Sequence, residues 1–328
     1  MKILFMGTPD FASGCLRRLI EDGREVAAVI TQPDKAMGRG MSKGYSDVKK
    51  CALEFEKPVF QPETLKDGAI KELLSDINPD IIVVVAYGKI LPEYVLNFPK
   101  YGCVNVHASL LPAYRGAAPI QRAVINGDKV TGVTTMLMDK GLDTGDMLLC
   151  ESYEIGENKN VGEVFDELSN IGAELLLKTL DGLEKGTLVP VKQDSSRATY
   201  AEKITAEECA IDFGKSVIEV HNRIRGLYPF PGAFCYHNGK LLKLCESRRF
   251  DEGSVANSDK LKADFEAHKD ACPGEIVSAS KDGVYVKCAD GFLRLTELKP
   301  EGKGKMRDVD LVNGRKISVG DVLKSDNE

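Results

Sequence analysis

The chain has 328 residues, of which 43% are hydrophobic and 29% charged, and its formal net charge is −6. This composition is typical of a soluble protein with apolar residues for two cores, and its acidity argues against a surface coated with basic charge. No long apolar run and no signal-peptide pattern is present, so we expect neither a membrane partner nor secretion. The nine cysteines are scattered without a C-x-x-C pair. They indicate a reducing, cytoplasmic location and argue against disulfides and a metal site.

The N-terminal segment predicts a β-α-β unit. Apolar residues predict a strand over 2–6, a helix over 11–21 with helical spacing, and a second strand over 26–30. A unit of this kind predicts a parallel sheet with a right-handed crossover. The turn after the first strand lacks the G-x-G-x-x-G fingerprint, because Gly7 and Gly14 are too far apart, which disfavours a nicotinamide cofactor.

The same reading continues along the first half of the chain. Residues 32–45 have no regular period and predict a long exposed loop, whereas the β-branched run over 80–87 predicts a strand buried on both faces. The other predicted elements are helices over 47–57, 65–77, 93–98, 119–126 and 161–183, and strands over 59–60, 103–107, 131–138 and 147–153. The fold class is therefore α/β, with a Rossmann-like, mostly parallel sheet in a domain over residues 1–188.

The last third of the chain differs in character. Residues 189–206 are polar with little period and predict a linker. From 207 to 328, short strands alternate with Asn-Gly and Asp-Gly turns, which predicts a small antiparallel β-barrel like an OB-fold. Residues 249–271 are polar and predict an insertion loop within it.

Two polar side chains end one predicted strand of the first domain. Asn105 and His107 alternate with Val104 and Val106, so they leave the strand on the same face. An amide donor beside a titratable ring suits an oxyanion that forms at a carbonyl. The alternative is that both side chains only satisfy buried neighbours.

Asp143 is a third candidate, in the Gly-rich turn from Gly141 to Gly145. Such a turn lets the backbone approach a ligand closely, although a solvated acidic turn would have the same composition. Asn105, His107 and Asp143 form a set of polar residues, and the sequence has no serine or cysteine nucleophile motif to accompany them. This set favours direct transfer of a carbonyl group to an external nucleophile.

These residues resemble a known family. Asn105-x-His107-x-Ser109-Leu110-Leu111-Pro112, followed by Asp143-x-Gly145, is similar to the folate-dependent formyltransferases. Other segments resemble the branch of that family that formylates methionyl-tRNA: Gly7–Ala12, Thr31–Asp34, Gly38–Gly40, Val84–Gly88, Arg115–Arg122 and Gly141–Asp146. The likeness covers nearly the whole chain and is weaker in the C-terminal domain.

The resemblance implies an enzyme that moves the formyl group of 10-formyltetrahydrofolate to the α-amino group of methionyl-initiator tRNA. In this scheme Asn105 donates to the oxyanion, His107 shares its charge and shuttles the proton, and Asp143 orients His107. The implied folate-binding residues are Val85, Tyr87, Gly88, Ile90, Leu91, Ser109, Leu110, Leu111, Pro112, Asp139 and Gly141.

The resemblance also implies a contact with tRNA. Residues 32–50 carry five positive and two negative charges, and Lys35, Arg39 and Lys43 are the implied tRNA-binding residues. The alternative is a solvated basic loop without a partner. The sequence after Gly40 is less basic than is common in the family, which leaves the details of this contact open. We expect the C-terminal barrel to contribute to tRNA binding and the protein to be a monomer.

Three alternatives remain. A formyltransferase acting on a sugar-nucleotide amine or on glycinamide ribonucleotide would share Asn105, His107 and Asp143. It is disfavoured by the basic loop and the barrel domain. A non-catalytic RNA-binding protein is disfavoured by the intact polar set, and a nicotinamide-dependent oxidoreductase by the missing glycine fingerprint.

Overall fold

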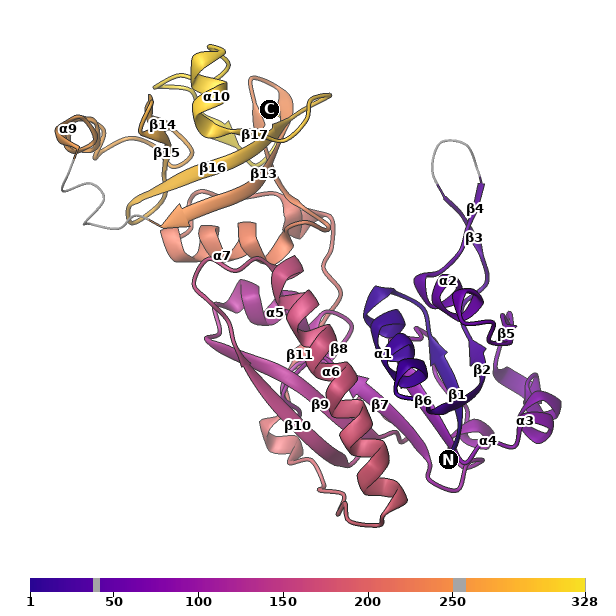
Figure 1. Ribbon diagram of the computed structural model, residues 1–328. Helices are drawn as coiled ribbons and strands as arrows, with labels where there is room; N and C mark the ends of the chain where they lie inside the picture. Colours follow the sequence, from indigo (N-terminus) through magenta and orange to yellow (C-terminus); the bar gives the residue numbers. More distant parts are fainter. Residues whose placement is uncertain (38–41, 250–257, 328) are drawn as a thin grey trace. The chain divides into compact units, whose positions relative to one another are not determined.

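The computed structural model of the protein describes residues 1–37, 42–249 and 258–327 (Figure 1). Its contacts divide the chain into two compact units. Unit 1 comprises Met1–Pro119, Val130–Glu154 and Phe165–Ala201, and unit 2 comprises Ile120–Lys129, Ile155–Val164 and Glu202–Glu328. No helix in the described ranges is both long and apolar enough to cross a membrane.

Unit 1 is built on a seven-stranded sheet in the order β10-β9-β7-β6-β1-β2-β5. The pairs from β7 to β5 are parallel, whereas β9 and β10 are antiparallel. This mostly parallel sheet confirms the predicted α/β, Rossmann-like fold. The strands are β1 (Lys2–Gly7), β2 (Glu25–Ile30), β5 (Val59–Phe60), β6 (Ile81–Val85), β7 (Cys103–His107), β9 (Val130–Leu137) and β10 (Met147–Glu154).

Helices cover both faces of this sheet. On one face, Leu4 of β1 packs in a core with Leu74 and Val95, which belong to α3 and α4. Phe11 of α1 meets Phe165 of α6 edge to face, with the ring centroids 5.5 Å apart. The helices with residues in unit 1 are α1 (Asp10–Glu21), α2 (Asp47–Glu54), α3 (Lys71–Ile77), α4 (Glu93–Leu96) and α6 (Val161–Glu184), with 3₁₀ turns η1 (Lys66–Gly68) and η2 (Ser195–Arg197).

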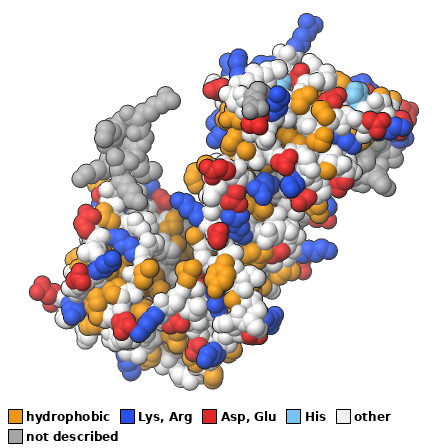
Figure 2. Space-filling model, turned by 180° about the vertical axis from the view of Figure 1, so that it is seen from behind, with side chains coloured by type: hydrophobic (Ala, Val, Ile, Leu, Met, Phe, Trp, Pro, Cys, Tyr) orange, Lys and Arg blue, Asp and Glu red, His pale blue; other side chains and the backbone are white. Residues whose placement is uncertain are grey.

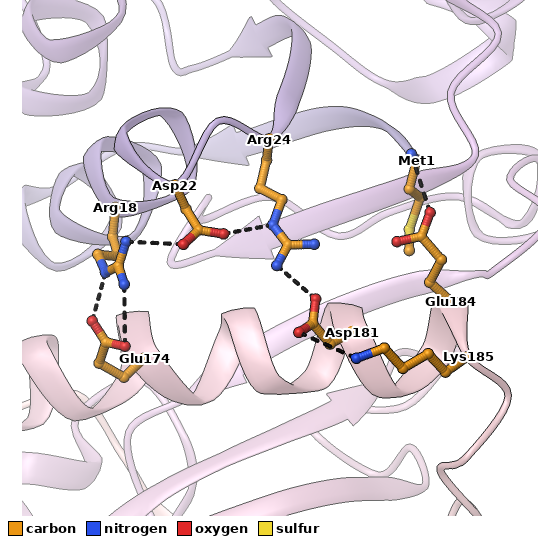
Figure 3. A network of polar contacts seen from close by, with 8 residues as sticks. All are labelled: Met1, Arg18, Asp22, Arg24, Glu174, Asp181, Glu184 and Lys185. Atoms are coloured by element: carbon orange, nitrogen blue, oxygen red, sulfur yellow. Dashed lines mark hydrogen bonds and ion pairs between the residues drawn. The ribbon is translucent and has the colours of Figure 1, made fainter.

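Ion pairs join the C-terminal part of α6 to the first β-α-β unit (Figure 3). Arg24 bridges two elements, because its Nη2 lies 2.6 Å from Asp181 of α6 and its Nε lies 2.8 Å from Asp22. Further contacts in the same network are Arg18–Glu174, Arg18–Asp22, Lys185–Asp181 and the N-terminal amine of Met1 with Glu184. The network therefore fixes α6 against α1 and the start of β1 by directional contacts in addition to apolar packing.

A hairpin stands where the sequence predicted an irregular loop over 32–45. β3 (Lys35–Met37) pairs antiparallel with β4 (Ser42–Gly44), so that prediction was wrong for these two strands. Strands of this length are too short to show an alternating pattern in the sequence. Arg39 lies outside the described residues.

Residues 189–201 pair with the backbone of unit 1. Val191 forms an antiparallel bridge to Met147, and β11 (Tyr200–Ala201) pairs in parallel with β8 (Arg115–Gly116). Gly116 has a φ of 122°, and a Cβ there would lie 2.8 Å from the Ala201 carbonyl oxygen, so glycine is required for this close approach. Residues 189–201 are polar and pair through their backbone, so their sequence shows no apolar period from which this pairing could be predicted. The division into domains over 1–188 and 207–328 stays a prediction.

Unit 2 contains a curled antiparallel sheet, a half-barrel, in the order β14-β15-β16-β13-β12-β18, with β17 paired to β16. This sheet agrees with the predicted OB-like domain. Asn238 and Gly239 both have positive φ, as expected of the predicted tight hairpin between β12 and β13. The strands are β12 (Ala233–His237), β13 (Lys240–Arg249), β14 (Ile276–Ser280), β15 (Gly283–Lys287), β16 (Phe292–Pro300), β17 (Met306–Arg307) and β18 (Leu323–Lys324).

Helix α7 closes the core of unit 2. Ser216 and Glu219 form a capping box at its N-terminus, and Ile224 and Leu227 pack in the core with strand residues such as Leu295. The helices that lie mainly in unit 2 are α5 (Pro119–Asn126), α7 (Val217–Leu227), α9 (Asp259–Ala267) and α10 (Asp308–Asn313), with η3 (Glu207–Cys209). The presence of α9 corrects the prediction of a loop over 249–271, of which residues 250–257 lie outside the described part.

A buried histidine on α7 links unit stability to pH. His221 is 1% exposed, and its ring nitrogens lie 2.8 Å from Ser247 Oγ and 3.0 Å from the backbone oxygen of Glu157. Burial is the main cause that lowers the pKa of His221 to about 4, and nearby arginines lower it further. The neutral ring is therefore the stable form in the folded unit.

The free energy of unfolding should fall as the pH drops from 6.5 towards 4. The unfolded chain binds a proton at His221 with the ordinary pKa of 6.5, whereas the folded chain binds it only near 4. The loss from this one group would reach about 3 kcal/mol near pH 4. Urea denaturation at several pH values should show this dependence in the wild type and in Ser247→Ala, which keeps the ring. His221→Gln should reduce it, and equal pH dependence in all three proteins would contradict the prediction.

Candidate active site

The side chains of β7 divide between the core and a polar edge. Val104 and Val106 are buried, Asn105 is half-buried, and His107 is buried at the end of the strand. β7 lies between β6, to which it is parallel, and the antiparallel β9. The polar pair thus lies near the carboxyl ends of the parallel strands, the edge at which open α/β sheets bind their ligands.

Both ring nitrogens of His107 face oxygen atoms. Nε2 lies 2.9 Å from the backbone oxygen of Tyr114, and Nδ1 lies 3.7 Å from Oδ2 of Asp143. A carbonyl oxygen can only accept a hydrogen bond, so the proton on the neutral ring belongs on Nε2. Nδ1 is then the nitrogen without a proton in the neutral ring, and it faces the carboxylate of Asp143.

Asp143 is held on both its side chain and its backbone. Its Oδ2 accepts a hydrogen bond of 2.8 Å from the backbone N–H of Gly116. Its φ is 53°, a left-handed conformation that is uncommon for residues other than glycine. At Gly145, a Cβ would collide with the backbone oxygen of Leu137, so only glycine fits the end of this turn. The glycines of this sequence therefore allow a tight turn of the backbone, and that turn directs the Asp143 carboxylate towards His107 and Gly116.

Asn105 has an unused hydrogen-bonding atom. Its Oδ1 is buried and has no hydrogen-bond partner among the residues that the structure describes. A buried acceptor without a partner is costly, which makes it a candidate for contact with a ligand. Across the same residues, no three His, Cys, Asp or Glu side chains are grouped so as to hold a metal ion.

The residue that fixes the Asp143 turn was not recognised from the sequence patterns. The buried side chain of Gln193 donates from Nε2 to the backbone oxygens of Asp143 and Gly145, at 2.8 and 2.7 Å. Its Oε1 accepts from Nε and Nη2 of Arg115, at 3.1 and 2.7 Å. Arg115 and Gly116 belong to a recognised segment, but Gln193 lies in a polar stretch with no period and no motif that could have revealed it.

Five of the predicted folate-binding residues lie at the end of β6 and in the loop that follows it. Val85, Tyr87 and Leu91 are buried, whereas Ile90 is 90% exposed. Gly88 has a φ of 81°, and a Cβ there would lie 2.6 Å from the side-chain nitrogen of Gln32.

Tyr87 in this loop is anchored through its backbone. Its carbonyl oxygen accepts from Thr8 Oγ1 at 3.1 Å and from Gln32 Nε2 at 2.9 Å. Its buried hydroxyl has no hydrogen-bond partner among the described residues, and burial raises its pKa to about 12. The loop therefore has a fixed backbone with one exposed apolar side chain at Ile90.

The remaining predicted folate-binding residues lie in two turns. Ser109 Oγ donates to the Ala113 oxygen at 2.6 Å, while Leu111 is buried and its bond to Pro112 is cis. Leu110 and Pro112 are half-buried. In the second turn, Asp139 Oδ1 accepts from the backbone N–H of Gly141 at 2.9 Å. Ser109, Leu111 and Asp139 are thus occupied by contacts within the protein, and a ligand would meet mainly the backbone at these positions.

Of the predicted tRNA-binding residues, Lys35 lies on β3 and Lys43 on β4, whereas Arg39 lies outside the described residues. Beside the hairpin, Lys49 Nζ lies 2.6 Å from Asp34 Oδ2, so part of the local positive charge is neutralised. On the face drawn in Figure 2, basic and acidic side chains are interspersed over the coloured residues.

Comparisons with known proteins cover both parts of the chain. The formyl transferase family matches residues 1–180, and the formyl transferase C-terminal domain matches residues 203–316. A methionyl-tRNA formyltransferase from Lachnospira eligens is 46% identical over 323 residues, which are 98% of this chain and 99% of the relative. Another, from Caldanaerobacter subterraneus, is 48% identical over 325 residues, which are 99% of this chain and 100% of the relative.

Solved structures share the fold at low sequence identity. HypX from Aquifex aeolicus, solved with tetrahydrofolic acid, has a TM-score of 0.61 at 17% identity and covers 97% of this chain and 48% of its own. An N-formyltransferase from Helicobacter canadensis, solved with folinic acid and dTDP-3-aminofucose, has a TM-score of 0.61 at 18% identity and covers 90% of this chain and 98% of its own. The two domain matches and the full-length relatives together establish that the chain belongs to the formyl transferase family.

Proposed function

We propose that this protein transfers the formyl group of 10-formyltetrahydrofolate to the α-amino group of methionyl-initiator tRNA. The acceptor is supported by the relatives named methionyl-tRNA formyltransferase, which match nearly the full length of the chain. The folate co-substrate is supported by the folate compounds in the two solved relatives. The observation that carries the chemistry is the approach of His107 Nδ1 to within 3.7 Å of Asp143 Oδ2, at the end of the strand that also bears the side-chain amide of Asn105.

In the proposed reaction, the amine nitrogen attacks the formyl carbon and the formyl oxygen becomes an oxyanion. Collapse of this intermediate breaks the bond from carbon to the folate nitrogen, which takes up a proton as the amine loses one. The side-chain amide of Asn105 donates to the oxyanion. A donor held in place in this way stabilises the charge that develops in the transition state.

The proton passes through Nδ1 of His107. Because Nε2–H donates to the Tyr114 oxygen, only Nδ1 is available for exchange, and its positive charge forms next to Asp143. The 3.7 Å separation is longer than a direct hydrogen bond. A small approach during the reaction, or one water molecule, would complete the path by which the carboxylate accepts the proton of the amine.

The proposed folate site fits the backbone of the loop after β6 and of the two turns described above. Gly88 and Gly141 leave backbone groups accessible, and the exposed side chain of Ile90 offers an apolar surface for an aromatic ring. The other proposed contacts are Val85, Tyr87, Leu91, Ser109, Leu110, Leu111, Pro112 and Asp139.

Replacement of the three polar residues tests the catalytic assignment. Asn105→Ala, His107→Ala and Asp143→Ala should each lower the rate of formyl transfer by at least about 10²-fold, the typical cost of losing one preorganised donor or acid–base group. Single-turnover assays with methionyl-tRNA and 10-formyltetrahydrofolate would measure this loss. Lys140→Ala, at an exposed position in the turn before Asp143, should retain activity. Near-normal turnover in Asp143→Ala or Asn105→Ala would refute the assignment.

The loop that contains Arg39 is proposed to bind the tRNA, with Lys35 and Lys43 beside it. Arg39→Ala should raise the KM for methionyl-tRNA about tenfold while folate binding is unchanged, because a guanidinium can pair with phosphate or a base. Binding should also weaken as the salt concentration rises. Lys66→Ala, at an exposed position on η1, is a control for the removal of one positive charge. An equal loss of tRNA and folate binding in Arg39→Ala would mean that the loop shapes the catalytic pocket instead.

The choice of acceptor can be tested directly. Incubation with 10-formyltetrahydrofolate and charged initiator or elongator methionyl-tRNA should give N-formylmethionine mainly on the initiator species. A parallel reaction with a sugar-nucleotide amine or glycinamide ribonucleotide should give no product. Formylation of either small amine without formylation of the initiator tRNA would overturn the proposed function.

A further inference from the structure

The side-chain amide of Gln193 uses all of its ordinary hydrogen-bonding capacity. Its two N–H groups donate to the backbone oxygens of Asp143 and Gly145, and its oxygen accepts twice from Arg115. An amide has two donor and two acceptor positions, so none is left over. The two donors from Arg115 and the two backbone acceptors also determine which terminal atom of the amide is Oε1 and which is Nε2.

The two oxygens that Gln193 binds belong to Asp143 itself and to Gly145, two residues further along the turn. Asp143 has a φ of 53°, which costs energy for a residue with a side chain and needs support from its surroundings. Gly145 cannot carry a side chain without a collision with the Leu137 oxygen. The amide therefore fixes the turn at its strained position and at its close approach to β9.

Arg115 holds Gln193 from the other side. It is 3% exposed, and its side-chain hydrogen bonds in the described part of the chain run to the Gln193 oxygen. Arg115 lies on β8, and the next residue, Gly116, donates its N–H to Asp143 Oδ2. One short strand thus holds the carboxylate directly and the backbone of its turn through Gln193.

We propose that Gln193, held by Arg115, is a positioning residue that sets the distance between the Asp143 carboxylate and Nδ1 of His107. The inference rests on the proposed function, in which that carboxylate orients His107 and accepts the proton of the amine. Gln193 contacts only the protein and acts through the backbone of the turn. A displacement of about 1 Å in a catalytic group can cost about 10²-fold in rate.

Two substitutions separate positioning from a purely structural role. Gln193→Met keeps the length of the side chain but removes both donors and the acceptor. Gln193→Glu keeps an acceptor for Arg115, with which it forms an ion pair, but removes both donors to the turn. Each variant should lower kcat about 10- to 100-fold with KM for both substrates within about threefold of the wild type.

A double-mutant cycle tests whether Gln193 acts through Asp143. In an Asp143→Asn background, Gln193→Met should lower kcat by less than about threefold, because the group that it positions has already lost its function. Asp194→Ala is the matched control: it lies next to Gln193, and its Oδ1 accepts from Ser196 N rather than contacting the turn. This control should retain wild-type kcat.

The outcomes are distinguishable. Wild-type kcat in both Gln193 variants, or a full second loss of kcat in the Asp143→Asn background, would overturn the inference while leaving the proposed function in place. An Asp143→Asn protein with normal turnover would instead remove the proposed role of Asp143, on which the inference rests. Absence of formylated product with the wild type would overturn the proposed function itself.

Discussion

The carboxylate of Asp143 lies 3.7 Å from the imidazole Nδ1 of His107, and the backbone on both sides of this contact is held by hydrogen bonds. His107 is fixed through its other nitrogen by the Tyr114 carbonyl oxygen, which leaves Nδ1 as the nitrogen that faces Asp143. Asp143 is fixed by a backbone N–H at its side chain and by an amide at its carbonyl. The geometry of the pair therefore depends on segments that are far apart in the sequence.

Strand topology explains how those segments meet. The parallel order of β7, β6 and β1 gathers the ends of these strands, with Asn105 and His107, along one edge of the sheet. β9 then runs antiparallel to β7, and the turn between β9 and β10 returns Asp143 to the same edge. The pairing of β8 with β11 brings two further segments to the turn that carries Asp143. One is β8 itself, with Arg115 and Gly116, and the other is the segment before β11, with Gln193.

The reaction and the acceptor rest on different physical grounds. Formyl transfer is supported by a set of polar groups within unit 1, where the side-chain amide of Asn105 and the ring of His107 lie on one strand and Asp143 lies 3.7 Å from that ring. The tRNA acceptor is supported by the relatives and by the excess of basic residues over 32–50, although Lys49 of α2 is paired with Asp34. Long-range electrostatic attraction of an acidic protein for RNA would be small, so local contacts must supply the binding.

The sequence by itself determined the α/β class, the curled C-terminal sheet and the candidate pair Asn105 and His107, because these follow from short-range patterns of alternation and turn residues. It did not reveal the β3–β4 hairpin, helix α9 or the pairing of residues 189–201 with unit 1, since short or polar elements leave no period. Only the tertiary structure decided which nitrogen of His107 faces Asp143 and that Gln193 fixes the turn. Those contacts join residues distant in sequence, and they depend on a left-handed backbone conformation at Asp143 that its residue type does not dictate.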